Sequence, residues 1–173
     1  MAIDVLISEQ QIAERVSILA KEIQKNYEGK ELVVICILNG AFVFCADLVR
    51  QINIPIFMDF MKASSYGDLT VSSGNLKIEL DLKVDIENKH VLLVEDIVDT
   101  GLTLSNIIQR LLSRKPASLK LASLLYKKAR NVHPVKIDYL GFSIEDLFVI
   151  GYGLDFAGKY RELPFVGVYN ESH

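Results

Sequence analysis

The chain has 173 residues and a formal net charge of -3 at pH 7, and it is 50% hydrophobic and 24% charged. These values predict one globular domain over residues 1–173 and argue against a protein whose main task is to bind nucleic acid. No apolar run approaches the roughly 18 residues of a membrane span, so we expect no membrane association. Two cysteines in apolar surroundings, Cys36 and Cys45, and the lack of a leader pattern predict buried, reduced thiols and a cytoplasmic location.

The N-terminal part of the chain has the pattern of a helix followed by a strand. Ser8-Glu9-Gln10-Gln11 is a capping-box pattern at the start of an amphipathic stretch, and Gly29 predicts the end of that helix. The run over 32–38 is apolar without a break, which is typical of a strand buried on both faces. Asn39-Gly40 interrupts the run and predicts the end of the strand.

The next elements indicate a parallel sheet. A helix over 41–50 and a strand over 54–61 complete a strand–helix–strand unit, which is the signature of parallel strands. Residues 64–77 are polar and small and show no helical period. So long a connection inside a compact domain is typically a functional lid or a disordered segment. Alternating apolar residues over 76–82 predict a strand that returns from this loop.

The second half of the chain continues the alternation. A strand over 91–94 and a helix over 104–112 flank the stretch from Glu95 to Thr103. A buried strand over 119–126 follows. Shorter strands are expected at 138–142, 148–151 and 165–169. The whole pattern predicts a doubly wound α/β domain with a parallel sheet core and a long loop after its second strand.

Three carboxylates and a Thr/Gly turn lie where the strand over 91–94 gives way to a helix. Ligands of open parallel sheets bind at the carboxyl ends of the strands. Backbone N–H groups at a helix start suit a phosphate, whereas Glu95, Asp96 and Asp99 suit Mg2+, ribose hydroxyls or a proton. By residue type alone, Glu95 and Asp96 are equally well explained as helix-start acids that complement the helix dipole.

This stretch resembles the motif that binds 5-phosphoribosyl 1-pyrophosphate (PRPP) in type I phosphoribosyltransferases: an apolar strand, two acids, two apolar residues, then Asp-Thr-Gly-x-Thr. The motif does not indicate which nucleobase accepts the phosphoribosyl group. Further motifs keep the order found in the hypoxanthine-guanine phosphoribosyltransferases, and the resemblance covers nearly the whole chain. These motifs are Ser65-Tyr66-Gly67, Leu125 to Lys128, Leu147 to Asp155 and Tyr160 to Pro164.

The resemblance implies the type I phosphoribosyltransferase fold, with a doubly wound core, a long mobile loop and a small hood built from terminal segments. It also implies Mg2+-dependent transfer of the 5-phosphoribosyl group from PRPP to N9 of a 6-oxopurine, giving IMP or GMP and pyrophosphate. The partners are then these small-molecule substrates, with no nucleic acid and no membrane. Small members of the family form homodimers or homotetramers, so we expect one of these assemblies.

The same resemblance gives roles to the acids and to the loop. Asp99 corresponds to the acceptor of the purine N7 proton. The Ser65-Tyr66 pair belongs to the mobile loop, which we expect to close over the reacting centre and exclude water. The Glu95-Asp96 pair corresponds to the acids that bind the ribose and the Mg2+ shell, and Asp155 to a direct Mg2+ ligand that faces the pyrophosphate.

Three further side chains correspond to binding residues. Lys127 corresponds to the donor to the 6-oxo group, and an ammonium, which donates but cannot accept, favours an oxygen over a 6-amino group. Phe148 corresponds to the residue that stacks on the base, and the backbone of Val149 contacts the edge of the base. Arg161 corresponds to the pyrophosphate clamp. By residue type alone, simpler explanations exist for all three. Lys127 would be a solvated lysine, Phe148 a core residue and Arg161 the partner of Glu162 in an ion pair.

Two backbone loops complete the implied site. Asn39-Gly40 matches the pyrophosphate loop, where a cis peptide recurs in the family and many members have Lys or Arg in place of Asn39. Without that charge, backbone N–H groups, Arg161 and Mg2+ would hold the pyrophosphate. The 5′-phosphate loop binds mainly through its backbone, so a leucine where some relatives have Lys is neutral. Its residues are Thr100, Gly101, Leu102, Thr103 and Leu104.

Two alternatives remain open at this point. One is a phosphoribosyltransferase that prefers xanthine, because only one or two backbone contacts would recognise the substituent at C2 of the purine. The other is a regulator that keeps the fold and uses PRPP or nucleotides as effectors, with RNA as a partner; the acidic balance and the complete set of implied site residues argue against it. A dinucleotide-binding protein is disfavoured, because no Gly-x-Gly-x-x-Gly follows the first predicted strand.

Overall fold

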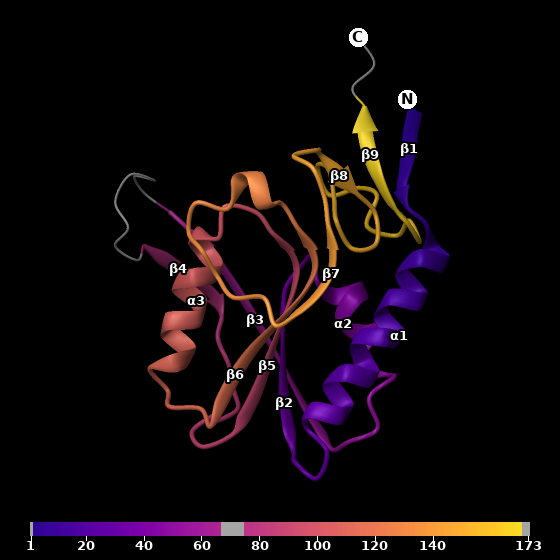
Figure 1. Cartoon of the computed structure of the whole chain (residues 1–173). Helices are drawn as coiled ribbons and strands as arrows, with labels where there is room; N and C mark the ends of the chain where they lie inside the picture. The colour runs from indigo at the N-terminus through magenta and orange to yellow at the C-terminus, as the bar shows by residue number, and fades with distance from the viewer. Residues whose placement is uncertain (1, 67–74, 171–173) are drawn as a thin grey trace.

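The computed structural model describes residues 2–66 and 75–170, which form two sheets and the helices that cover the larger one (Figure 1). The helices are α1 (Glu9–Asn26), α2 (Phe42–Val49) and α3 (Leu102–Leu112), with a short 3-10 helix, η1 (Lys128–Arg130). The strands are β1 (Ala2–Ile7), β2 (Leu32–Ile37), β3 (Ile56–Ser65), β4 (Leu76–Leu80), β5 (His90–Val98), β6 (Ser118–Tyr126), β7 (Tyr139–Ser143), β8 (Val149–Ile150) and β9 (Val166–Asn170).

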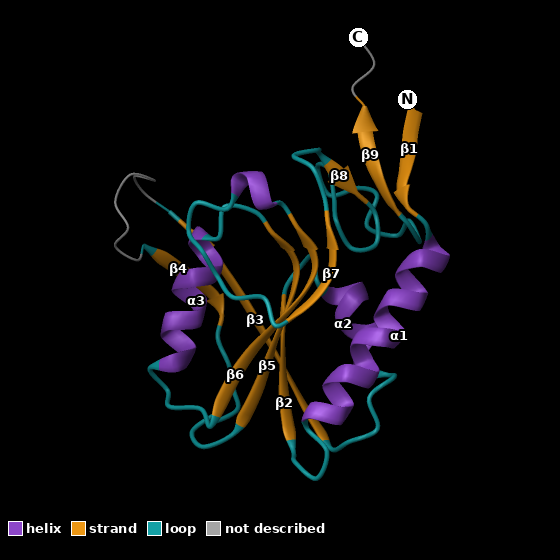
Figure 2. Ribbon diagram, viewed as in Figure 1, coloured by secondary structure: helices purple, strands orange, loops and turns teal. Residues whose placement is uncertain are grey.

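The larger sheet has the strand order β4-β3-β2-β5-β6-β7 within the described chain. In this order, each pair of neighbours from β3 through β2, β5 and β6 to β7 is parallel. The edge strand β4 is antiparallel to its neighbour β3. Figure 2 shows α1 and α2 on one side of this sheet and α3 on the other. The predicted doubly wound α/β core is therefore confirmed.

The central strand β2 explains why its sequence is apolar without a break. Every residue of β2 is buried. Val34 and Cys36 belong to the core cluster under α1 and α2, whereas Val33 and Ile35 belong to the cluster under α3. Alternate side chains of one strand thus fill two separate cores, which is the arrangement that the pattern predicted.

The first helix begins as predicted and ends earlier. The Ser8 hydroxyl accepts a bond from the N–H of Gln11, and the Gln11 side chain accepts one from the N–H of Ser8, which completes the capping box. The helix ends at Asn26 with Tyr27 as its cap, before Gly29. Gly29, with φ of +74°, lies in the turn that leads to β2.

Two strands run further than their sequences predicted. β3 continues to Ser65 because its last residues pair with β4, so Ser64 and Ser65 belong to a strand and not to the loop. β5 continues to Val98 because it stays paired with β6, which brings Glu95-Asp96 inside the strand. The rest of the predicted mobile loop, including its closure, falls on 67–74 and lies outside the described residues.

The smaller sheet joins the two ends of the chain. Its strand order is β1-β9-β8, and β1 and β9 pair in antiparallel fashion. The sequence did not predict β1, but the hood of terminal segments expected from the resemblance is present. In Figure 1 this hood lies at the same end of the molecule as the carboxyl end of β7.

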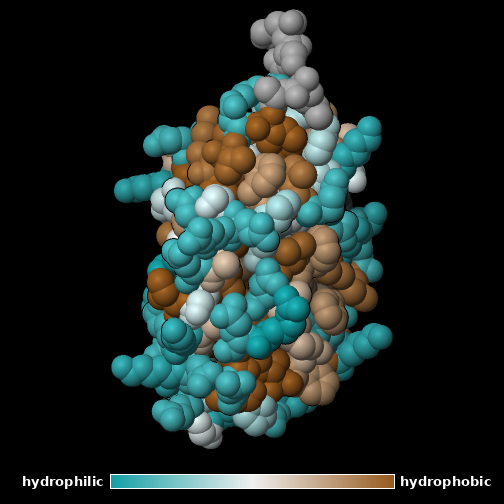
Figure 3. Space-filling view, turned by 90° about the vertical axis from the view of Figure 1, so that its right-hand side faces the viewer, coloured by the Kyte–Doolittle hydropathy of each residue, from teal (hydrophilic) through white to brown (hydrophobic). Residues whose placement is uncertain are grey.

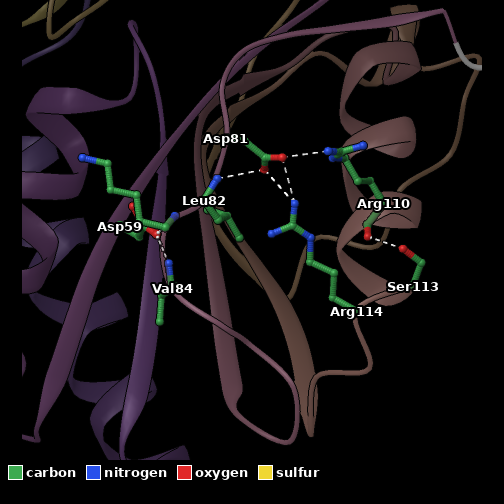
Figure 4. A network of polar contacts seen from close by, with 8 residues as sticks. Asp59, Asp81, Leu82, Val84, Arg110, Ser113 and Arg114 are labelled. Atoms are coloured by element: carbon green, nitrogen blue, oxygen red, sulfur yellow. Dashed lines mark hydrogen bonds and ion pairs between the residues drawn. The ribbon is translucent and has the colours of Figure 1, made fainter.

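Two carboxylates anchor the segment that follows β4 (Figure 4). Asp59 of β3 accepts bonds from the N–H groups of Lys83 and Val84, at 2.8 and 2.9 Å. Asp81 accepts bonds from the guanidinium groups of Arg110 and Arg114, at 2.7 and 2.8 Å. These contacts tie β3, the segment after β4 and the C-terminal end of α3 together.

The two cysteines lie in the core cluster under α1 and α2, as their apolar surroundings predicted. Cys36 and Cys45 are free and buried. Their mutual hydrogen bond, followed by burial, raises the pKa of the Cys36 thiol above its ordinary range. Among the described residues, no helix is long and apolar enough to cross a membrane.

Candidate active site

The two adjacent acids lie where β5 loses its neighbour on one side. β2 pairs with β5 only as far as Val94. Beyond that point the N–H of Asp96 donates to Oε1 of Glu95 (2.9 Å), and the N–H of Ile97 donates to Oδ1 of Asp96 (2.7 Å). Burial, and then the neighbouring charge of Asp96, raise the pKa of the Glu95 carboxyl well above its usual range. The two carboxylates thus stand at the open carboxyl edge of the sheet.

The Asn39-Gly40 loop packs directly against these acids. The peptide bond between Leu38 and Asn39 is cis. A Cβ on Gly40 would overlap Oδ2 of Asp96, and a Cβ on Gly153 of the hood would overlap the carbonyl oxygen of Gly40. Because both glycines lack a side chain, the loop after β2 packs directly against β5 on one side and against the hood on the other.

The Thr/Gly turn forms the start of α3. Gly101 occupies the N-cap with φ of +84°, and in the described chain no side chain caps the helix there. Oγ1 of Thr100 accepts a long hydrogen bond, 3.4 Å, from the N–H of Leu102. The N–H groups of a first helical turn have no carbonyl partner within the helix. The turn therefore offers N–H donors to an anion, as the phosphate-loop prediction requires.

Ser65 reaches this helix start from β3. Its hydroxyl oxygen is 2.7 Å from that of Thr103. Tyr66, the next residue, donates its backbone N–H to the carbonyl of Asn75, and its side chain is 60% exposed. The structure thus brings Ser65 to the predicted phosphate loop and leaves the Tyr66 ring largely in solvent.

Lys127 follows β6 and is the buried cation of this edge. Only 8% of it is exposed, and its backbone N–H donates to the carbonyl of Val98, 3.0 Å away and just before Asp99. Its ammonium lies 3.6 Å from Oδ1 of Asp146. A solvated lysine is therefore the wrong explanation for Lys127, whereas it fits the exposed Lys128.

Phe148 comes from the hood side of the same edge. Its ring is 50% exposed and makes edge contacts with Phe156 and Tyr169, at centroid distances of 5.6 and 6.2 Å. Val149, which begins β8, is buried. Phe148 is thus not a core residue, and its free surface suits stacking against a planar ligand.

Arg161 and Asp155 form a pair within the hood. Nη2 of Arg161 is 3.2 Å from Oδ1 of Asp155, and Nη1 donates to the carbonyl of Gly153, 2.6 Å away. The second oxygen of Asp155 accepts the N–H of Gly158. The ion pair of Arg161 is therefore with Asp155 rather than with Glu162, and through Gly153 it adjoins the Asn39-Gly40 loop.

Two residues of this edge were missed by the sequence reasoning. Nε of Arg130 lies 2.8 Å from Oδ1 of Asp99, an ion pair without hydrogen-bond alignment. Nη1 of Arg130 lies 3.8 Å from the same Asp146 oxygen that faces Lys127. The available signals were weak: Arg130 ends the densest basic cluster of the chain, and Asp146 stands two residues before Phe148.

The carboxylates suit a magnesium ion that is shared with phosphates. Mg2+ in such sites takes one or two protein carboxylates and completes its shell with water and substrate phosphates. Asp155 lies beside Arg161, and Asp96, next to Glu95 in β5, lies against Gly40. Over residues 2–66 and 75–170, no three His, Cys, Asp or Glu side chains converge to hold a metal by themselves.

Comparison with known proteins agrees with this arrangement. The family model described as "Phosphoribosyl transferase domain" matches residues 4–157. A hypoxanthine-guanine phosphoribosyltransferase of Dictyostelium discoideum is 48% identical, over 99% of this chain and 97% of its own length. A hypoxanthine-guanine-xanthine phosphoribosyltransferase of Tritrichomonas foetus is 46% identical, over 97% of this chain and 92% of its own.

The solved structures show the same relationship. The crystal structure of a hypoxanthine-guanine phosphoribosyltransferase from Bacillus anthracis superposes with a TM-score of 0.92 and 46% identity, over 96% of this chain and 98% of that one. The chain therefore belongs to the phosphoribosyltransferase family. Within it, the resemblance to the hypoxanthine-guanine phosphoribosyltransferases, first seen in the motifs, is confirmed over nearly the full length.

Proposed function

We propose that this enzyme transfers the 5-phosphoribosyl group of PRPP to N9 of hypoxanthine or guanine, giving IMP or GMP in purine salvage. The observation that carries the proposal is the juxtaposition of Lys127 and Asp99. A buried ammonium and a carboxylate come from adjacent strands, and the N–H of Lys127 is bonded to the residue before Asp99. The O6 and N7 atoms of a 6-oxopurine lie side by side and call for one donor and one acceptor.

The reaction asks for charge stabilisation rather than covalent catalysis. N9 of the purine attacks C1′ of the ribose as the bond from C1′ to the pyrophosphate oxygen breaks, through a transition state that resembles an oxocarbenium ion. Asp99 accepts the proton from N7, and Lys127 donates to O6. The face of Phe148 stacks on the base while the backbone of Val149 contacts its edge. Positioning and electrostatics then supply most of the rate.

The two phosphate ends are held by different parts of the site. The N–H groups and hydroxyls of residues 100–104 hold the 5′-phosphate. The backbone of Asn39-Gly40 and the guanidinium of Arg161 hold the pyrophosphate. Asp155 and the Glu95-Asp96 pair would hold Mg2+, which neutralises the charge of the leaving pyrophosphate when it is bound. Ser65 and Tyr66 cover the reacting centre and keep water from PRPP.

Two departures from the family pattern are accommodated by the backbone. Asn39 brings no charge to the pyrophosphate loop, but the loop's contact with Asp96 depends on Gly40 and not on the Asn39 side chain. Leu102 is the first residue of α3, where the phosphate donors are main-chain N–H groups. Both substitutions leave the proposed contacts intact.

We further propose a homodimer or homotetramer in the cytoplasm. Large apolar side chains on α2 and β3 are exposed, Phe42 at 45% and Phe60 at 42%. On the face shown in Figure 3, apolar side chains also form separate patches among hydrophilic ones. Exposed apolar area of this kind is typical of subunit contacts. Free, buried thiols suit a reducing compartment. Light scattering after gel filtration gives the assembly mass directly.

The enzyme assay that tests the function uses PRPP, Mg2+ and one base at a time. We expect nucleotide formation with hypoxanthine and guanine and none with adenine. Turnover with xanthine would add a third base to the substrate range, one that the name of the Tritrichomonas relative includes. No turnover with any base would refute the proposal and favour a regulator that only binds PRPP. Turnover with adenine as fast as with hypoxanthine would refute the role of Lys127.

A further inference from the structure

Lys127 is a buried cation with a single carboxylate beside it. Its ammonium lies 3.6 Å from Oδ1 of Asp146, and this is its one ion pair within the described residues. The Lys127 side chain is only 10% exposed, and a buried ammonium is costly without a counter-charge. Asp146 itself lies between β7 and β8, two residues before Phe148. It therefore fixes the position of the ammonium relative to the aromatic segment of the hood.

Asp146 also connects Lys127 to Asp99. Its Oδ1 is 3.8 Å from Nη1 of Arg130, and Nε of the same guanidinium is 2.8 Å from Oδ1 of Asp99. The four side chains form a row of alternating charge: ammonium, carboxylate, guanidinium, carboxylate. Asp146 and Arg130 thus join the two groups at its ends.

The ends of this row are the groups that the proposed function assigns to O6 and N7 of the purine. The guanidinium of Arg130 pairs with one of the two oxygens of Asp99, Oδ1. A base that donates its N7–H to Oδ1 of Asp99 takes the oxygen with which Arg130 pairs, so the base and Arg130 compete for that oxygen. Nη1 of Arg130 already faces Asp146, so a small side-chain movement gives it a second carboxylate.

We propose that Asp146 is a positioning residue for the 6-oxopurine, which fixes the ammonium of Lys127 and receives Arg130 from Asp99 when the base binds. This inference rests on the proposed transfer reaction and adds to it the residues that prepare the base site. Arg130 and the base then compete for Asp99, and Asp146 offers Arg130 a second carboxylate when the base binds.

The first test compares Asp146→Asn with Glu145→Gln. Glu145 is the adjacent exposed acid, and within the described chain its side chain has no ion pair. We expect Asp146→Asn to raise KM for hypoxanthine about tenfold, to leave KM for PRPP unchanged and to lower the unfolding temperature, because the buried ammonium loses its counter-charge. We expect Glu145→Gln to change none of these. Equal rises in both KM values, or no rise for hypoxanthine, would overturn the proposal.

The second test isolates the handover of Arg130, that is, its movement from Asp99 to Asp146 when the base binds. Arg130→Gln removes the competitor for Asp99, so we expect KM for hypoxanthine to fall about threefold, with the exposed neighbour Lys128→Gln as the unchanged control. In the Arg130→Gln background, Asp146→Asn should raise KM less than it does alone, because only the contact with Lys127 is then lost. An undiminished rise would overturn the handover.

The assay separates this inference from the reaction on which it rests. If the unaltered chain forms no nucleotide from any base, the transfer reaction is refuted before any variant is compared. If it forms IMP normally and Asp146→Asn matches Glu145→Gln in KM for hypoxanthine, only the role of Asp146 is refuted.

Discussion

The hydroxyl oxygens of Ser65 and Thr103 are 2.7 Å apart, which joins the end of β3 to the first turn of α3. One residue begins the predicted lid and the other belongs to the predicted phosphate loop. Either hydroxyl can be the donor. Because a phosphate oxygen can only accept from Thr103, phosphate binding leaves Ser65 to donate to Thr103 or to separate from it. Occupancy of the phosphate loop is thereby coupled to the start of the lid.

The Thr103 hydroxyl should contribute to PRPP binding in particular. We expect Thr103→Val to raise KM for PRPP about tenfold, since a hydrogen bond to a charged group contributes about 1.5 to 3 kcal/mol. KM for hypoxanthine should not change. Ser105→Ala is the matched control in the same helix, because the Ser105 hydroxyl already donates its proton to the carbonyl of Leu102. Steady-state kinetics with each substrate varied in turn give both values, and equal effects of the two variants would contradict the assignment.

Gly40 should be needed for its lack of a side chain. A Cβ at this position would overlap Oδ2 of Asp96, so we expect Gly40→Ala to displace the acid or the loop and to lower kcat/KM for PRPP at least tenfold. Gly29→Ala is the matched control, because a Cβ there meets nothing within 4 Å and only the positive φ is strained. It should cost about 1 kcal/mol of stability and leave the kinetics intact. Normal kinetics for Gly40→Ala would show that the overlap is relieved without consequence.

The core of the fold was predictable because its signals are local. The unbroken apolar run of β2 and the Asp-Thr-Gly-x-Thr stretch after β5 each carry their meaning within a few residues. β1 was not predictable on those grounds. It is a strand because it pairs with β9 at the other end of the chain, and Val5 within it is exposed. Strand formation of this kind depends on a distant partner rather than on propensity.

The candidate site shows the same division. Asp99 and Lys127 stand in short motifs, whereas the pairing of Asp99 with Arg130, and of Lys127 with Asp146, arises only when three loops converge. The length of β3 was missed for a related reason. Ser64 and Ser65 have the composition of a loop, but antiparallel pairing with β4 holds them in the sheet.

Asp59 should make the fold sensitive to acid. Burial by itself would raise the pKa of this carboxyl, but N–H donors from Val84, Phe60 and Lys83 outweigh it and hold the pKa below its ordinary value. A folded-state pKa below the unfolded value, about 3.9, means that the carboxylate stabilises the fold above that pH. The contribution is lost as pH falls below about 4, through the folded-state pKa.

Replacement of Asp59 should reveal this contribution. We expect Asp59→Asn to lower the free energy of unfolding at pH 7 by about 1 to 3 kcal/mol, because an amide has one oxygen for N–H groups that now bond to two. The loss should shrink as the pH approaches 3. Asp85→Asn is the control, since exposed Asp85 accepts a single N–H bond, from Glu87. Urea unfolding at several pH values measures the difference, and a loss that is constant with pH would contradict the assignment.

Asp99 should be required for turnover and dispensable for folding. Asn at this position keeps the shape but cannot take up the N7 proton, and loss of a general base costs about 100-fold or more in rate. We therefore expect Asp99→Asn to lower kcat at least 100-fold with hypoxanthine. Its ion pair with Arg130 is about half exposed on both sides, so the free energy of unfolding should change by less than about 1 kcal/mol. Arg130→Gln serves as the control, because it breaks the same ion pair and leaves the carboxylate in place. If both variants lost kcat equally, the ion pair and not the proton acceptor would be the essential feature.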